Sequence, residues 1–494
     1  MRRRLNSGLM FLLIVVLTIS GCAPSTQQPA AEQTTWGELR GLQFPENYPT
    51  PAAADRLYDE MLFHRATQVV LWSIPAMTLW AMKTGSEAQF GEGSNVFPIW
   101  KGRLSAETLV STPNSDVIYG MGYLDLDKDG PTVIDVPPLL QGILDDFWHR
   151  PITDVGFVGP DQGEGGKYLI LPPGYEGDRP DGYYTFESST YNVFVFWRAF
   201  IQDGDTAAPV ALMEQTRIYP LSAAANPPEM IFPDGTGQPA DMLSPMDYSY
   251  FEGLAEFVQR EAVGPEDWAM RGMMASLGIV KGRPFEPDAE MREILSAGAE
   301  VGMKMAQTLR FGEKLPGTKY YDDRQWNNVL NVLDVEFRHD SYLDIDARVG
   351  MFKIGYSISP AMVMNMVGAG SKYPFAYRDS AGDFLSGGSS YRLHLPADVP
   401  AANFWSVTLY DAENASGLRN GQPFPSIGSL SDLTYNDDGS VDLYFGPELP
   451  EGGLESNYLR TVPGKGWFTL LRLYSPTEAF FDQTWRPGDF EKLD

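Results

Sequence analysis

The stretch Tyr191-Asn-Val-Phe-Val-Phe-Trp-Arg-Ala-Phe200 is an almost unbroken run of β-branched and aromatic side chains. Side chains of these types fit the pleated, half-buried surface of a strand. Four similar runs precede it, at residues 116–124, 132–136, 168–171 and 183–188, and Gly, Pro and Asp bound them. The pattern predicts an N-terminal region of short antiparallel strands joined by tight turns.

A second series of such runs lies near the C-terminus, at residues 391–395, 404–410, 441–445 and 467–474. In the run 404–410, the side chains on the Trp405 face are more apolar than those on the face that includes Tyr410. Because successive side chains of a strand point to opposite faces, Trp405 is predicted to lie in a core. Tyr410 is predicted to be exposed or to face a pocket.

Between and before the two series, the hydrophobic period changes from 2 to about 3.6, which indicates helices. This change occurs at residues 55–82, 248–261 and 288–309. Pro75 is expected to break or kink the first helix. We therefore expect a mainly β protein with a helical middle. The predicted parts are a signal peptide at 1–21, a lipidated flexible leash at 22–35, an N-terminal β domain with a leading helix at 36–220, a helical middle region at 221–370 and a C-terminal β domain at 371–494.

The first residues predict export. Three arginines at positions 2–4 precede an apolar run at residues 9–19, which is shorter than the about 20 residues that cross a bilayer. The run ends in Ile19-Ser-Gly-Cys22, which resembles the lipobox of bacterial lipoproteins, and Cys22 is the only cysteine. Cys22 is therefore the predicted lipidation site; the alternative is a chance cysteine beside an ordinary signal peptide. The lipid anchors the chain to a membrane of the bacterial cell envelope, and Ala23 favours the outer membrane if the host has two.

The remaining composition limits partners and cofactors. The chain has 65 acidic against 37 basic residues, a formal net charge of −28. So acidic a surface repels phosphates, which excludes a nucleic-acid partner. The four histidines are widely separated, and neither a metal-ligand spacing, a phosphate loop nor a Gly-x-Ser-x-Gly elbow is present. The sequence predicts no metal and no cofactor.

Several ordered strings resemble a known pair of domains. Strings similar to the domain of unknown function 1254 are Ser111-Thr-Pro-Asn-Ser-Asp116, Gly159-Pro-Asp-Gln-Gly-Glu-Gly-Gly-Lys-Tyr168 and Leu277-Gly-Ile-Val-Lys-Gly-Arg-Pro-Phe285. Strings similar to its usual partner, the domain of unknown function 1214, are Tyr391-Arg-Leu-His-Leu-Pro396, Asn403-Phe-Trp-Ser-Val-Thr-Leu-Tyr-Asp411 and Pro463-Gly-Lys-Gly-Trp-Phe468. The resemblance covers nearly the whole mature chain. It implies two antiparallel β-sandwich or jelly-roll-like domains joined by helices, it is compatible with a homo-oligomer, and it brings no established activity.

The densest group of reactive side chains is Asp145-Asp-Phe-Trp-His-Arg150, at a predicted strand edge. Two carboxylates, an imidazole and a guanidinium within six positions suit the binding or protonation of a polar substrate. Structural ion pairs at a domain junction have the same composition. Asp145, His149 and Arg150 are therefore candidate ligand-binding residues, and both interpretations stay open.

A second candidate group begins at the entry to a predicted strand. Asn114 and Asp116 lie there, either as caps of a turn or as the polar floor of a pocket. Lys167, Tyr168 and Arg198, from neighbouring predicted strands, would complete that floor.

Two functions from different classes follow. The first is a membrane-anchored module that binds a sugar or small organic ligand or serves in envelope assembly, and presents Trp100, Trp148, Trp405 and Tyr410. The second is a hydrolase with a carboxylate and histidine site in a cleft between the domains. Convergence of Asp145 or Asp146 with His149, Lys167 and Arg198 in one closed pocket would favour the hydrolase. Whether the protein is an enzyme is left open.

Overall fold

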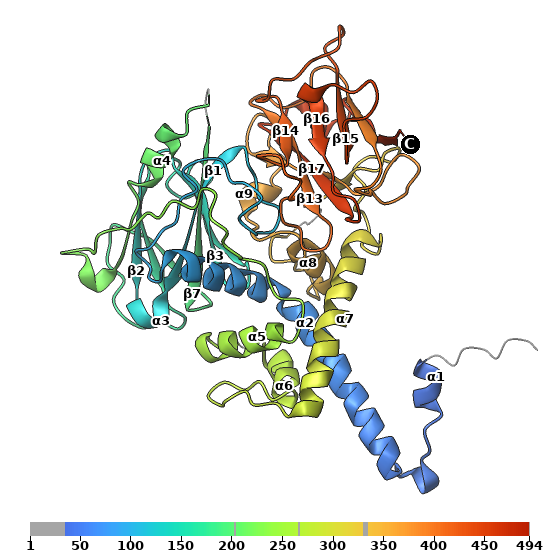
Figure 1. The fold of residues 1–494 in the computed structure, drawn as a ribbon. Helices are drawn as coiled ribbons and strands as arrows, with labels where there is room; N and C mark the ends of the chain where they lie inside the picture. Colours follow the sequence, from blue (N-terminus) through green and yellow to red (C-terminus); the bar gives the residue numbers. More distant parts are fainter. Residues whose placement is uncertain (1–34, 202–203, 265–266, 330–333, 494) are drawn as a thin grey trace, which may run out of the picture. The chain divides into compact units, whose positions relative to one another are not determined.

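The computed structural model of the protein describes residues 35–201, 204–264, 267–329 and 334–493 (Figure 1). The predicted signal peptide and Cys22 lie outside these residues. The chain divides into two compact units, Met1–Glu60 and Met61–Asp494. Among the described residues, the first unit contains α1 (Thr35–Arg40) and the beginning of α2 (Pro51–Phe90). Within the described ranges, no helix combines the length and the apolar character that a membrane crossing requires.

The N-terminal region contains two four-stranded sheets. Their strands are β1 (Val117–Asp125), β2 (Thr132–Val136), β3 (Gln141–Asp146), β4 (Pro151–Val155), β5 (Gly166–Leu171), β6 (Tyr184–Glu187), β7 (Asn192–Phe200) and β8 (Arg217–Pro220). One sheet has the order β1-β7-β3-β4 and is antiparallel throughout. The other has the order β6-β5-β2-β8, in which only β5 and β6 are parallel. Val195 and Trp197 of the first sheet share a core with Ile134 and Ile170 of the second.

Helices bury the opposite face of the β1-β7-β3-β4 sheet. They are the part of α2 from Met61 onward, α5 (Ser249–Arg260), α6 (Trp268–Ser276), α7 (Ala289–Phe311) and α8 (Ile345–Phe352). Tyr123 and Phe194 of the sheet belong to the same apolar core as Met77 and Phe257 of the helices. Asp288 caps α7, because its carboxylate accepts a hydrogen bond from the Met291 N–H at 2.9 Å. Shorter helices are α3 (Leu126–Asp129), α4 (Ala207–Met213), α9 (Pro360–Val363) and α10 (Glu478–Phe481).

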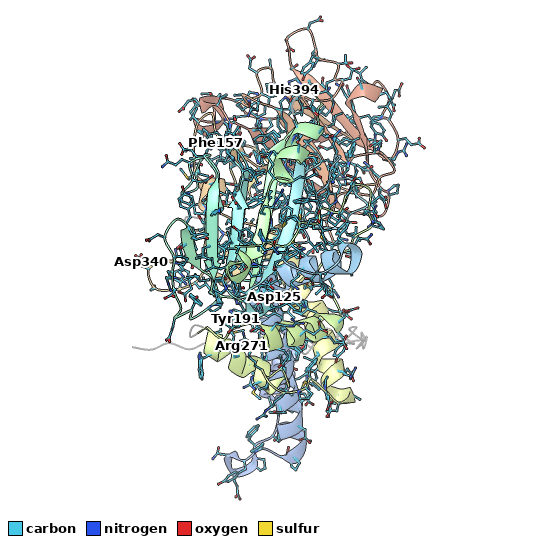
Figure 2. The ribbon with its side chains drawn as sticks, turned by 90° about the vertical axis from the view of Figure 1, so that its left-hand side faces the viewer. Asp125, Phe157, Tyr191, Arg271, Asp340 and His394 are labelled. Carbon is cyan, nitrogen blue, oxygen red and sulfur yellow. The ribbon has the colours of Figure 1, made fainter. Side chains whose placement is uncertain are left out.

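The C-terminal region has two further sheets. Their strands are β9 (Asn327–Asn328), β10 (Ser371–Lys372), β11 (Pro374–Ala376), β12 (Tyr391–Leu395), β13 (Trp405–Asp411), β14 (Ser426–Gly428), β15 (Val441–Gly446), β16 (Tyr458–Arg460), β17 (Trp467–Tyr474) and β18 (Phe490–Lys492). One sheet has the order β14-β13-β17-β11-β9, with β10 also on β17; the other has the order β16-β15-β12-β18. Residues of both, such as Leu393 and Leu471, share one core. Figure 2 places His394, on β12, within this region.

The fold confirms the prediction of antiparallel sheets with a helical middle. The runs at 132–136, 391–395 and 467–474 have the bounds of β2, β12 and β17. Pro75 does not break α2, which continues to Phe90. The prediction of purely antiparallel sheets is wrong at two pairs, β5 with β6 and β15 with β16. The sandwich or jelly-roll description and the domain boundaries stay predictions.

Candidate functional site

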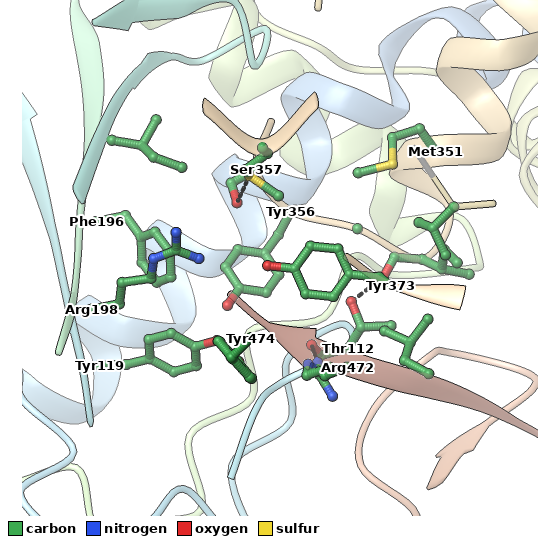
Figure 3. Close-up of a pocket in the computed structure, with 16 residues that line it drawn as sticks. Thr112, Tyr119, Phe196, Arg198, Met351, Tyr356, Ser357, Tyr373, Arg472 and Tyr474 are labelled. Atoms are coloured by element: carbon green, nitrogen blue, oxygen red, sulfur yellow. Dashed lines mark hydrogen bonds between the residues drawn. The ribbon is translucent and has the colours of Figure 1, made fainter. Parts of the chain in front are cut away.

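A pocket lies where both β regions and the segment after α8 meet (Figure 3). We call it the inner pocket, and its empty volume is about 680 Å³. Its polar lining consists of two arginines, four tyrosines, a threonine and a serine: Arg198, Arg472, Tyr119, Tyr356, Tyr373, Tyr474, Thr112 and Ser357. Among the described lining residues, none carries a carboxylate.

The tyrosine hydroxyls supply hydrogen-bond donors to this space. Figure 3 shows the hydroxyls of Tyr119, Tyr356 and Tyr373 turned toward a common point, which Arg198 approaches from the side of β7. Burial raises the pKa of Tyr119 to about 12, and burial also holds the pKa of Tyr356 and of Tyr474 well above the usual value. These phenols are therefore neutral near pH 7, and each hydroxyl can donate one hydrogen bond.

Arg472 is buried near the middle of the apolar strand β17, and neutral acceptors hold its guanidinium. One terminal nitrogen donates to Thr408 Oγ1 at 3.0 Å and to the hydroxyl of Tyr410. The other donates to the carbonyl oxygens of Thr112 at 3.0 Å and Pro113 at 3.2 Å. Within the described part of the chain, no carboxylate forms an ion pair with Arg472. An arginine keeps its charge inside a protein, so this site holds a buried positive charge.

Arg198 brings a second positive charge from the facing sheet. It lies on β7, opposite Tyr119 of β1 and Gln141 of β3 in the strand register. Its side chain is partly exposed to the pocket, and no ion pair of Arg198 occurs among the residues that the structure describes. The two arginines therefore leave the lining of the inner pocket with a net positive charge.

The backbone at Thr112 adopts an uncommon conformation beside this charge. Its φ is +38°, a left-handed value that is an outlier for a β-branched residue. The Thr112 hydroxyl donates to the carbonyl of Ile354 at 2.7 Å, while its own carbonyl accepts from Arg472. Backbone strain of this kind tends to cluster at functional sites. Here it places a carbonyl against the buried guanidinium.

Three residues predicted from the sequence belong to this site. Arg198 lines the inner pocket directly. Asn114 is buried behind it and donates its side-chain amide to the hydroxyl of Tyr474, while its Oδ1 accepts from the Asp116 N–H at 2.9 Å. Tyr410 is fully buried, so the prediction of an exposed or pocket-facing side chain is wrong. Its ring packs on Phe468, and its hydroxyl donates to the carbonyl of Pro113 at 2.8 Å.

The other residues of the predicted polar floor do not reach this pocket. Asp116 forms an ion pair with Arg103 at 2.8 Å and accepts from the Ser426 hydroxyl at 3.0 Å. Lys167 is exposed on β5, in the other N-terminal sheet, with its Nζ 4.0 Å from a carboxylate oxygen of Asp135. Tyr168 faces that sheet's core and donates to Asp161 at 2.7 Å.

The group Asp145–Arg150 forms a separate, closed cluster. The side chains of Asp145 and His149 are 0% exposed, and their nearest polar atoms, Oδ2 and Nδ1, are 3.6 Å apart. His149 has φ +56°, and its ring stacks on Phe352 with 4.3 Å between centroids. Burial lowers the pKa of His149 to about 3, and burial together with Asp146 raises the pKa of Asp145 well above its usual range. His149 is therefore neutral near pH 7, and the surroundings of Asp145 disfavour its charged form.

Asp146 caps the same turn, and Arg150 lies outside the closed pair. Its N–H donates to Asp146 Oδ1 at 2.8 Å, and its guanidinium reaches Ser189 Oγ at 3.3 Å.

The structure does not bring Asp145, His149, Lys167 and Arg198 into one pocket. Across the described ranges, no three histidine, cysteine or acidic side chains gather as they would around a metal ion.

The aromatic residues proposed to present a ligand are core residues instead. Trp100, Trp148, Trp405 and Tyr410 are all buried. Trp148 packs on Trp72 with ring centroids 4.4 Å apart. The burial of Trp405 confirms its predicted place in a core, and none of the four offers a free stacking face.

Sequence reasoning missed Arg472 and the four tyrosines of the inner pocket. A signal for Arg472 exists in Trp467-Phe-Thr-Leu-Leu-Arg-Leu-Tyr474, where one arginine interrupts an apolar strand. Arg198 interrupts β7 in the same way. An arginine within an otherwise apolar strand indicates a buried charge that needs partners.

Comparisons with known proteins agree with the resemblance seen in the sequence. A protein of unknown function family, DUF1254, matches residues 94–220, and a second, DUF1214, matches residues 370–478. No curated protein matches the chain. The crystal structure of the VPA0106 protein from Vibrio parahaemolyticus is similar at 17% identity with a TM-score of 0.51, over 88% of this chain and 100% of that one. An uncharacterised protein from Burkholderia cenocepacia is similar at 12% identity with a TM-score of 0.41, over 90% and 97%. At 17% identity, the Vibrio likeness concerns the fold alone.

Proposed function

We propose that this chain, in which a DUF1254 domain precedes a DUF1214 domain, binds a small organic anion in the inner pocket. The observation that carries the proposal is the pair Arg198 and Arg472, which share a pocket without a carboxylate in its described lining. Buried charges in proteins are ordinarily paired. An anionic group of a ligand would supply the missing partner, and the neutral tyrosine hydroxyls would donate to its remaining oxygens.

The position of the pocket supports this role. Tyr119 and Arg198 belong to the DUF1254 match, whereas Tyr373, Arg472 and Tyr474 belong to the DUF1214 match. Neither domain alone provides both arginines, so the site requires the two domains in one chain. Guanidinium groups suit carboxylates and phosphates because their N–H groups match the spacing of two oxygens.

The hydrolase hypothesis receives less support from the geometry. Its histidine and carboxylate are both 0% exposed, and the Phe352 ring covers the imidazole. A general base must come within hydrogen-bond reach of the proton that it removes. His149 and Asp145 offer no such approach in this conformation.

The binding proposal is tested with hexanoate and its neutral analogue hexan-1-ol, by ligand-observed NMR on the purified protein. Hexanoate should bind and hexanol should bind more weakly. Arg198→Met keeps most of the side-chain volume and removes the charge, so it should lower hexanoate affinity by about tenfold or more, the value of a charge-assisted hydrogen bond.

Arg217→Met is the matched control, because Arg217 lies on a strand of the other N-terminal sheet and donates to the carbonyls of Glu214 and Thr216. Equal hexanoate binding by wild type and Arg198→Met would refute the proposal.

We also propose that the protein works from a membrane of the bacterial cell envelope, anchored by a lipid on Cys22. The support is the ordered series of basic residues, apolar run and small residues before the only cysteine. Cys22→Ser should release the protein from the membrane fraction, measured by fractionation and immunoblotting. Retention of this variant after a salt wash would contradict lipid anchoring.

A further inference from the structure

The inner pocket borders a second, larger cavity, which we call the outer groove. The two share four lining residues, Ile143, Phe196, Arg198 and Met362. The outer groove has an empty volume of about 1260 Å³. Arg198 therefore stands at the junction, with the polar inner pocket on one side and the outer groove on the other.

The outer groove has an apolar rim. Its distal lining includes Phe157, Val158, Met364 and Met366, and these apolar side chains are exposed by 65%, 48%, 44% and 38%. Figure 2 labels Phe157. A cluster of exposed apolar residues at the edge of a cavity is typical of a binding surface. Methionine side chains are flexible and adapt to apolar ligands of varied shape.

The groove contains one carboxylate among its described lining residues, Asp154. Asp154 Oδ2 accepts a hydrogen bond from the Ala361 N–H at 3.1 Å, and Asp154 forms no ion pair with Arg198 in the described ranges. A carboxylate at this place disfavours a second anion in the groove. The anionic end of a ligand is therefore directed past Arg198 into the inner pocket, and the rest of the ligand lies along the apolar wall.

We propose that the ligand is an anionic amphiphile, whose carboxylate or phosphate lies between Arg198 and Arg472 and whose hydrocarbon chain occupies the outer groove. This inference rests on the proposed anion site and names the class of ligand that the site takes. The adjacency of the two cavities, which both include Arg198 in their lining, carries it, because a small anion alone leaves the apolar groove and its methionines without an occupant.

The test extends the hexanoate experiment by chain length. Dodecanoate, kept below its micellar concentration, is compared with hexanoate on wild type, on Arg198→Met and on the double variant Met364→Ser with Met366→Ser. Each buried methylene adds about fourfold in affinity, so wild type should bind dodecanoate at least about tenfold more tightly than hexanoate. The double variant should lose most of this gain and keep its affinity for hexanoate.

The controls separate the inference from the proposal on which it rests. Met305 is 40% exposed on α7 and lines neither cavity, so Met305→Ser should leave the gain unchanged. Tighter binding of monododecyl phosphate than of dodecanoate would assign a phosphate head group, and the reverse order a fatty acid; either supports the inference.

Three outcomes would overturn it. Equal affinities of wild type for hexanoate and dodecanoate would overturn the amphiphile while the anion site stands. A gain that persists in the double methionine variant would overturn the placement of the chain in the groove. Absence of binding by both acids would overturn the anion site itself.

Discussion

Asp145 and Arg198 lie on neighbouring strands of the same sheet, but their surroundings differ. The Asp145 side chain is fully enclosed, whereas Arg198 lines a cavity. Asp145 on β3 is enclosed with His149, whose ring stacks on Phe352, and burial disfavours the charged form of both groups. Arg198 on β7 opens to the inner pocket and the outer groove. Shifted pKa values occur at both places, but only the inner pocket has arginines that form no ion pair within the described residues.

The difference follows from the chemistry of the groups. A carboxyl or an imidazole in an apolar environment can become neutral by binding or losing a proton. Guanidinium cannot do so at physiological pH, and its charge has to be met by acceptors or by an anion. The shifted pKa values of Asp145 and His149 are therefore compatible with a purely structural role. Arg198 and Arg472 keep their charges, and an anionic ligand can supply a partner for them.

The largest predicted effect is the dependence of stability on pH that comes from Asp145 and His149 in the closed cluster. The pKa of His149 is about 3 in the folded state against 6.5 unfolded, so only the unfolded chain takes up this proton between those values. Stability is therefore lost as the pH falls through this window. At pH values above the ordinary pKa of a carboxyl, Asp145 has the opposite effect on stability. Burial raises its pKa in the folded state, so the native state keeps a proton that the unfolded chain releases.

Asp145→Asn removes the opposing contribution and leaves that of His149. The variant should lose about 3.5 kcal/mol of stability between pH 6.5 and pH 4, at about 1.4 kcal/mol per pH unit and proton, and wild type should lose less. Urea denaturation at several pH values measures this difference. Asp135→Asn, an exposed carboxylate in the other sheet, should run parallel to wild type. Parallel curves for Asp145→Asn as well would mean that the buried pair is not neutral.

The second prediction concerns Arg472 in the inner pocket. Arg472→Met leaves the carbonyl oxygens of Thr112 and Pro113 without this donor, and it should destabilise the fold by about 2 kcal/mol. The same variant should abolish hexanoate binding. Arg392 is exposed and pairs with Glu491 at 2.6 Å, so Arg392→Met should change stability by no more than about 0.5 kcal/mol. A more stable Arg472→Met protein would show that the buried charge is a net cost that only a ligand offsets.

The same contrast shows what the sequence could predict. The sequence predicts strands such as β2, β12 and β17 because their apolar runs are long and periodic. It also predicts Arg198 as a polar residue on such a strand. Its partner Arg472 comes from the other β region, and no local pattern predicts which distant strands face one another. Lys167 was predicted to line the same polar pocket floor as Arg198. That prediction is wrong because alternation along a strand does not reveal that β5 and β7 belong to different sheets.

The smallest predicted effect tests how the two clusters differ in their supporting hydrogen bonds. Tyr410→Phe keeps the ring that packs on Phe468 and removes a hydroxyl that donates to Pro113 and accepts from Arg472. The expected loss is about 1.5 kcal/mol, because two buried hydrogen bonds disappear while Pro113 and Arg472 keep other partners, and Tyr435→Phe on the exposed surface should cost nothing measurable. Chemical denaturation measures the stability, and hexanoate titration measures the affinity. Because Arg472 loses one of its four anchors, the affinity should also fall by a few-fold, an effect that no change at Asp145 should produce. An unchanged denaturation midpoint with a large loss of affinity would instead place the phenol in contact with the ligand, as the alternation in strand 404–410 first suggested.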